Sequence, residues 1–299
     1  MQNSVLVLYN PTARKGKIAN FIPYIEKRLK TKYKIVDFLA SKSAEDLKHQ
    51  AKVNAGLYDL LIIAGGDGSI HLAINGIKES GHSPTVAFLP YGTVNDVCRT
   101  LNIPKNMRKA MDIILRGETI MYDTMKDHEK YYIYTLAGGM FVSTSFKTNR
   151  KLKNTFGKLA YYINGFKEVI QMRSLPLTVN ADGEEFHGRF ILCMLLNSTS
   201  AAGYRINKDK DIDDQLVDLI LIEKKKHYIA SLFVLLRMFL FGLKHVRKSK
   251  LVTIRKCKKV HIENHSNEPF TKDGEQEEFF KKDISISSPV KVIYNKLKY

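Results

Sequence analysis

The chain of 299 residues is 44% hydrophobic and 26% charged, the proportions of an ordinary globular protein with room for a large core. Its three scattered cysteines exclude a disulfide framework and a cysteine zinc site, and they fit a reducing cytosol. The start has no basic region ahead of its apolar run, so we expect no secretory signal. The net charge of +18 predicts an anionic partner.

The first 123 residues alternate short apolar strands with amphipathic helices. Strands are expected at 5–9, 33–39, 60–64 and 86–89, and helices at 18–30, 43–53, 70–77, 94–101 and 106–115. This alternation predicts βαβ units, and therefore an open parallel sheet with helices on both faces. We assign residues 1–123 to an α/β domain of this kind.

Beyond Asp123 the pattern becomes mainly β. Strands are expected at 131–136, 175–180, 186–197, 216–222, 251–254, 259–262 and 284–286, and helices at 157–172 and 229–243. These strands predict a second, antiparallel β domain at 124–289, and the tail 290–299 is expected to return to the first domain. An exposed edge strand in the β domain would allow a homodimer.

Positive charge is concentrated in residues 224–259, which contain twelve Lys or Arg and no Asp or Glu. The apolar stretch 228–243 inside this segment is too short to span a bilayer and is interrupted by Arg237. Two interpretations remain open: a helix on an anionic membrane surface, or a core helix with solvated basic ends. Nucleic acid is disfavoured, because the aromatic residues lie in the apolar stretch rather than among the basic ones.

Three polar turns follow strands of the first domain, at residues 10–17, 65–69 and 90–96. The carboxyl ends of parallel strands meet at one edge of a sheet, so these turns are expected to line one crevice. Gly65-Gly66-Asp67-Gly68-Ser69 would let the backbone approach a phosphate, and Asp67 suits a bridging magnesium ion. The sequence contains neither a Walker A motif nor G-x-G-x-x-G.

These three turns together resemble the bacterial soluble diacylglycerol kinase family, whose catalytic domain also occurs in sphingosine and ceramide kinases. The resemblance covers nearly the whole chain and continues at residues 156–162, 213–216 and 273–275. It implies an ATP-binding α/β domain, a β-rich lipid-substrate domain and an active site in the cleft between them. The glycine turn alone is shared with NAD kinases.

The resemblance also implies residue roles. Nucleotide phosphates would lie against Asn10, Pro11, Thr12, Ala13, Arg14, Gly66, Asp67, Gly68 and Ser69, with Ser41 and Thr93 nearby. The catalytic magnesium would be organised by Asp67, Asp96 and Asp123, and Glu275 would be the general base. A structural magnesium would be held by the Asp214 side chain and by the backbone carbonyls of Asp211 and Leu216.

Several features leave alternatives open. Asp-Gly-Glu occurs at 182–184 as well as at 273–275, and Asp-Gly is also a common hairpin turn; the family pattern selects Glu275. The acidic run 209–218 fits either a cation site or a solvated loop. The chain departs from the family at five positions, where Ser41, Ser69, His71, Leu72 and Gln215 stand. If residue 215 has a positive φ, Gln there costs about 1 kcal/mol.

We therefore expect a cytoplasmic kinase, peripherally bound to the inner face of the membrane, that uses ATP and Mg²⁺ to phosphorylate a lipid hydroxyl of phospholipid metabolism. Diacylglycerol is the expected acceptor, although the sequence does not choose among lipid alcohols. The alternatives are an NAD kinase-like phosphotransferase and a non-catalytic lipid- or nucleotide-binding protein.

Overall fold

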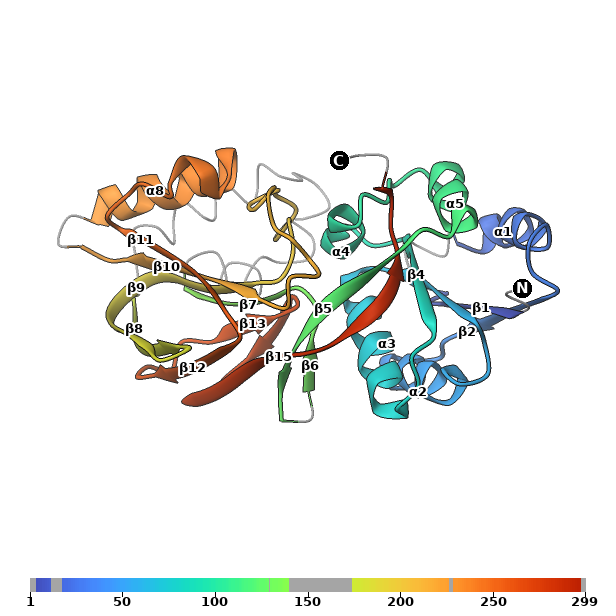
Figure 1. Ribbon diagram of the computed structural model, residues 1–299, viewed down its shortest axis with the longest axis horizontal. Coiled ribbons are helices and arrows are strands. Elements are labelled where there is room, and N and C mark those ends of the chain that lie inside the picture. Colours follow the sequence, from blue (N-terminus) through green and yellow to red (C-terminus); the bar gives the residue numbers. More distant parts are fainter. Residues whose placement is uncertain (1–3, 12–17, 129, 140–173, 226–227, 297–299) are drawn as a thin grey trace.

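The computed structural model describes residues 4–11, 18–128, 130–139, 174–225 and 228–296. The expected helix at 157–172 and the family motif at 156–162 lie outside these residues. The described part has two regions, an α/β region and a β-rich region, which are joined by long strands that run between them (Figure 1). The predicted fold class is confirmed.

The α/β region contains a parallel sheet in the order β2-β1-β3-β4. Its strands are β1 (Ser4–Tyr9), β2 (Ile35–Ala40), β3 (Leu60–Gly65) and β4 (Thr85–Pro90). Its helices are η1 (Ala19–Phe21), α1 (Ile22–Leu29), α2 (Ala44–Asn54), α3 (Asp67–Ser80), α4 (Asp96–Thr100) and α5 (Met107–Arg116). Figure 1 shows α2 and α3 on one face of the sheet and α1, α4 and α5 on the other.

Helix starts in this region follow local capping chemistry. The Ser43 hydroxyl accepts the Asp46 N–H at 3.1 Å, which makes Ser43 the N-cap of α2 as expected. Helix α3 starts three residues earlier than expected, because Gly66 is the extended N-cap and Asp67 already has helical geometry. Much of the glycine turn is therefore the first turn of a helix, whose backbone N–H groups have no partner within the helix.

The β-rich region extends the same sheet in the order β14-β13-β7-β9-β8-β12-β15, with β10 and β11 branching from β9. The strands are β6 (Lys130–Tyr132), β7 (Thr135–Gly139), β8 (Leu175–Ala181), β9 (Glu184–Leu196), β10 (Val217–Glu223), β11 (Val252–Cys257), β12 (Lys259–Asn264), β13 (Phe270–Lys272) and β14 (Glu275–Glu277). Helix α8 (Tyr228–Phe241) and the short η2 (Leu243–His245) cover β9 and β10. Among the described helices, none combines the length and apolar character that crossing a bilayer requires.

One expectation about a strand was wrong, and some observed strands were not predicted. The strand expected at 131–136 is broken into β6 and β7, because the backbone N–H groups of residues 133–135 bind the Asp273 carboxylate instead of a neighbouring strand. The hairpin β13–β14 was not expected as strands, since its arms are only three residues long.

Two long strands connect the regions. β5 (Thr119–Asp127) and β15 (Lys281–Ile293) pair antiparallel, and β15 reaches both β12 and β4 (Figure 1). Val290, Val292 and Ile293 belong to the hydrophobic core of the α/β region. The domain limits at residues 123 and 289 stay predictions, as does the homodimer.

Candidate active site

The expected phosphate-binding turns lie side by side at the carboxyl edge of the parallel sheet. The Asn10 N–H donates to the Ala64 carbonyl, the Ser41 N–H to the Tyr9 carbonyl, and the Tyr91 N–H to the Gly65 carbonyl, so adjacent strands stay paired to their ends. Thr12, Ala13 and Arg14, the other predicted phosphate contacts of the first turn, lie outside the described residues.

The second and third turns touch directly. A Cβ on Gly92 would lie 2.4 Å from the Gly66 Cα, so position 92 needs glycine. Asn95 fixes the third turn from inside, since its side chain accepts the Gly92 N–H and donates to the Gly92 carbonyl, each at 2.7 Å. Asn95 has a left-handed backbone, which Asn tolerates. The exposed Thr93 side chain lies in this same turn.

Asp67 links the glycine turn to helix α4. Its carboxylate accepts the Val97 N–H at 3.1 Å. Burial raises the pKa of Asp67, the N–H groups of residues 95–97 oppose that shift, and the negative charge of Asp273 adds to it; the net shift is upward. This carboxylate therefore carries its charge in a partly dry site, where a cation would lower its energy.

Asp96 is fully buried and is held from both regions. Ser200 and Arg99 donate side-chain hydrogen bonds to it, and the Gly203 N–H lies 3.1 Å from both carboxylate oxygens. Burial raises the pKa of Asp96 to about 6. The hydrogen bonds from Ser200 and Gly203 lower this pKa, whereas the negative charge of Asp67 raises it further. The polar run 197–200 that supplies Ser200 is also buried.

Asp123 contacts a different loop. Its carboxylate accepts the Gln215 N–H at 2.6 Å, and its own N–H donates to the Ile212 carbonyl at 2.9 Å. Burial raises the pKa of Asp123, while the positive charge of Lys210 opposes the shift. Gln215 has φ 55°, the left-handed conformation in which a glutamine costs about 1 kcal/mol. The loop 207–218 is thus fixed to Asp123 despite local strain.

Two of the three expected metal donors of this loop already have partners. Lys210 Nζ lies 3.0 Å from Asp214 Oδ1 and 2.6 Å from the Leu216 carbonyl oxygen. Lys256 Nζ lies 2.5 Å from Asp214 Oδ2, whereas the Asp211 side chain is exposed and accepts the Asp213 N–H at 3.4 Å. Within the described residues, no group of three or more His, Cys, Asp or Glu side chains is placed to hold a metal ion.

Asp273 joins the two regions at the site. Its buried carboxylate accepts the N–H groups of residues 133–135 at 2.7–3.0 Å and contacts His71 Nδ1 at 2.7 Å. His71 lies one helical turn after Asp67 on α3, and Asp273 lies two residues before Glu275. The family departure at His71 therefore creates a contact that spans the site. The Glu275 side chain is exposed and, among the described residues, has no hydrogen-bond or ion-pair partner.

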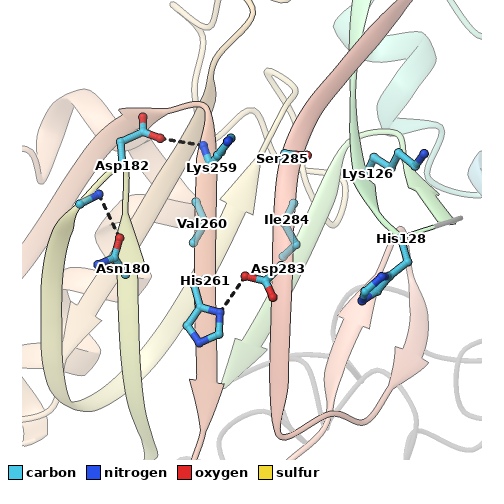
Figure 2. A pocket seen from close by; sticks show the side chains of 11 residues that line it. Lys126, His128, Asn180, Asp182, Lys259, Val260, His261, Asp283, Ile284 and Ser285 are labelled. Atoms are coloured by element: carbon cyan, nitrogen blue, oxygen red, sulfur yellow. Dashed lines mark hydrogen bonds and ion pairs between the residues drawn. The ribbon is translucent and has the colours of Figure 1, made fainter.

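The other Asp-Gly-Glu copy lies on a different surface. Asp182 accepts the N–H groups of Lys258 and Lys259 at 2.8 Å each, and Glu184 forms a two-pronged ion pair with Arg255. Figure 2 shows Asp182 at the rim of a groove of about 570 Å³, in which His261 also contacts Asp283. This groove is formed by β5, β8, β12 and β15 and includes none of the predicted site residues.

Comparison with known proteins covers both regions. A model of the diacylglycerol kinase catalytic domain matches residues 4–126, and one of the YegS C-terminal NAD kinase beta sandwich-like domain matches residues 138–287. A diacylglycerol kinase of Staphylococcus aureus is 32% identical over 92% of this chain and 87% of its own length; that of Staphylococcus carnosus is 30% identical over 92% and 89%. The chain belongs to the diacylglycerol kinase family.

A crystal structure of a diacylglycerol kinase from Bacillus anthracis has the same fold, with a TM-score of 0.82 at 22% identity and coverage of 100% of this chain and 99% of that one. Its membership of the diacylglycerol kinase family makes this chain a phosphotransferase of the diacylglycerol kinase type. The family implies ATP as its phosphoryl donor.

Sequence analysis did not find several residues that hold this kinase's site together. Ser200, Arg99 and Gly203 orient Asp96, and the Asn197 side chain donates to the Asp123 carbonyl at 2.6 Å. One signal was available in residues 197–200, four consecutive polar residues that directly follow the long apolar run of β9. Such a buried polar run indicates that its side chains form hydrogen bonds inside the protein. The role of Asp273 could not be predicted, because its partners are more than 100 residues away in the sequence. The role of Lys210 was missed, because its partners were predicted to bind a metal.

Proposed function

We propose that this kinase transfers the γ-phosphoryl group of ATP to the hydroxyl of a diacylglycerol, forming phosphatidic acid and ADP. The observation that carries the proposal is the His71–Asp273 contact. It joins the helix that begins with Asp67 to the turn that presents Glu275, so that phosphate-binding and base-bearing elements meet.

The proposed chemistry follows from the surroundings of each carboxylate. A magnesium ion would be carried by the phosphates of ATP, and the negative charges of Asp67, Asp96 and Asp123 would attract it. Backbone N–H groups at the start of α3 receive the phosphates. The Glu275 carboxylate takes the proton of the acceptor hydroxyl, whose oxygen bonds to the γ-phosphorus while the bond from that phosphorus to the bridging oxygen of ADP breaks. An exposed carboxylate without a partner suits a base that meets an incoming substrate.

A direct assay tests the acceptor. The purified kinase is incubated with γ-labelled ATP, magnesium and vesicles of phosphatidylglycerol containing diacylglycerol, and the lipid extract is resolved for labelled phosphatidic acid. The same reaction with NAD in place of vesicles tests the alternative acceptor. Label in phosphatidic acid, and none in the dinucleotide, is the expected result. Label in another lipid would replace the acceptor, and ATP binding without any product would indicate a non-catalytic nucleotide-binding protein.

Helix α8 supports a location at the membrane. One face packs into the core through Leu235 and Met238, while Ile229, Phe233 and Leu240 on the other are 60–69% exposed. Exposed basic side chains adjoin this apolar face, namely Arg237, Lys244, Arg247, Lys248 and Lys250. The sequence left open whether this helix lies on a membrane or in the core; its buried side fits a core helix, and its exposed side fits a membrane-surface helix. We propose that the exposed side rests on an anionic bilayer at the cytoplasmic face.

The end of α8 also adjoins the active site. Leu243 N–H donates to the Ile206 carbonyl at 2.7 Å, and the Phe239 and Tyr204 rings meet edge to face at 5.8 Å. Tyr204 follows Gly203, whose N–H binds Asp96. A bilayer under α8 would thus lie against the loop that holds a catalytic carboxylate.

A substitution tests this placement. Phe233→Ser should lower activity on diacylglycerol in anionic vesicles and leave activity on a short-chain, water-soluble diacylglycerol unchanged. Leu57→Ser is the matched control, because Leu57 is 70% exposed but lies in the α/β region. Equal losses on both substrates would mean that Phe233 acts on the fold rather than on the membrane.

A further inference from the structure

The loop 207–218 contains a buried lysine where the resemblance to the kinase family predicts a structural magnesium ion. The Lys210 side chain is fully buried, and its ammonium group contacts Asp214 Oδ1 and the Leu216 carbonyl. These are two of the three donors expected to bind the structural magnesium. A divalent ion needs oxygen ligands at about 2.0–2.1 Å and would displace the ammonium group from both. The residues of this loop therefore do not fit a magnesium ion while Lys210 is in place.

We propose that Lys210 is a built-in cation that replaces the structural magnesium in this protein, so that the loop keeps its shape without a metal. An ammonium group supplies one positive charge and three hydrogen-bond donors, enough to bind a carboxylate and a carbonyl together.

The charge balance of the loop supports a resident monocation. Asp214 receives Lys210 on one oxygen and Lys256 on the other, at 3.0 and 2.5 Å. The Asp214 side chain between these two ammonium groups is only 15% exposed. Asp218, also buried, is held by the Asn207 side chain at 2.7 Å. A further divalent charge would have to enter beside two ammonium groups.

The position of Lys210 links it to Asp123, one of the predicted catalytic carboxylates. The loop it closes presents the Gln215 N–H to Asp123 and the Ile212 carbonyl to the Asp123 N–H. Lys210 is thus a positioning residue for Asp123, and the strained Gln215 backbone persists because the contacts on both sides fix it. The proposal holds whichever lipid alcohol is the acceptor.

The test uses nucleotide-free protein, so its outcome is separate from that of the kinase assay. Thermal unfolding of the full chain is followed in EDTA and in excess MgCl₂, for the natural protein and for Lys210→Met, Lys210→Ala and Lys208→Met. Lys208 is the control, because it lies on the same loop with an exposed side chain. A titration with Mn²⁺ followed by electron paramagnetic resonance reports metal binding directly.

We expect the Tm of the natural protein and of Lys208→Met to be the same in EDTA and in magnesium. Lys210→Met should lower Tm by roughly 5–15 °C in both, since it leaves a buried carboxylate short of a partner. Lys210→Ala should lower Tm in EDTA, regain part of it in magnesium and bind a Mn²⁺ ion that the natural protein does not.

Two results would overturn the proposal. One is a natural protein whose Tm rises in magnesium, with the rise abolished by Asp214→Asn. The other is a Lys210→Met variant as stable as the natural protein. If Lys210→Ala does not fold in either solution, the comparison of the natural protein in EDTA and magnesium still decides the question.

Discussion

The chain forms an Asp-Gly-Glu turn twice, and the two copies differ only in what surrounds them. In both, Asp and Gly have positive φ (48° and 93° at 273–274, 49° and 95° at 182–183) and join two antiparallel strands. Asp182 is exposed and Glu184 is neutralised by Arg255. Asp273 is buried against α3 and Glu275 is exposed without a partner among the described residues. Equal turns thus acquire different chemistry from their tertiary neighbours.

The largest difference is expected in activity. Glu275→Gln should lower kcat in the vesicle assay by roughly 10²–10⁴-fold, because a glutamine cannot take the acceptor proton. Glu184→Gln, the same change in the other turn, should leave kcat unchanged. Circular dichroism should show both variants folded. A Glu275→Gln enzyme with full activity would end the assignment of the base.

Stability should separate the two aspartates next. Asp273→Asn places an amide N–H₂ against backbone N–H donors and His71 in a buried site, so the free energy of unfolding should fall by about 3–5 kcal/mol. Asp182→Asn loses one exposed hydrogen bond and should cost about 1 kcal/mol. Urea titrations of the two variants measure the difference, and equal values would contradict the distinction between the turns.

The pH dependence of stability should reveal the buried carboxylate of Asp96. Because the pKa of Asp96 is raised to about 6, the folded state binds its proton more tightly than the unfolded chain. This contribution is therefore greatest below about pH 4 and is lost as pH rises to about 6, up to roughly 3 kcal/mol. Asp96→Asn should remove this slope in urea titrations between pH 4 and 7. The same slope in the variant would assign it to another group.

The smallest effect concerns a pair of histidines. His71→Asn restores the residue usual in the family but removes the contact with Asp273, so the free energy of unfolding should fall by about 2 kcal/mol. His187, which contacts Glu185 beside the other turn, is exposed, and His187→Asn should change nothing measurable. If His71→Asn leaves the free energy of unfolding unchanged, Asp273 is held by its backbone donors alone.

Much of this protein was determined by local sequence. Apolar runs and caps predicted the parallel strands and the start of α2, and the glycine turns predicted which edge of the sheet carries the proposed phosphate site. Backbone conformation and hydrogen bonding between neighbours decide these features. The break between β6 and β7, the burial of Asp96 and the roles of His71 and Lys210 were decided by contacts across 100 residues or more, or by a loop closing on itself. The sequence shows that an aspartate or glutamate is present, and its carboxylate can bind a proton, a cation or an amide N–H. Only the folded chain shows which of these partners is within reach.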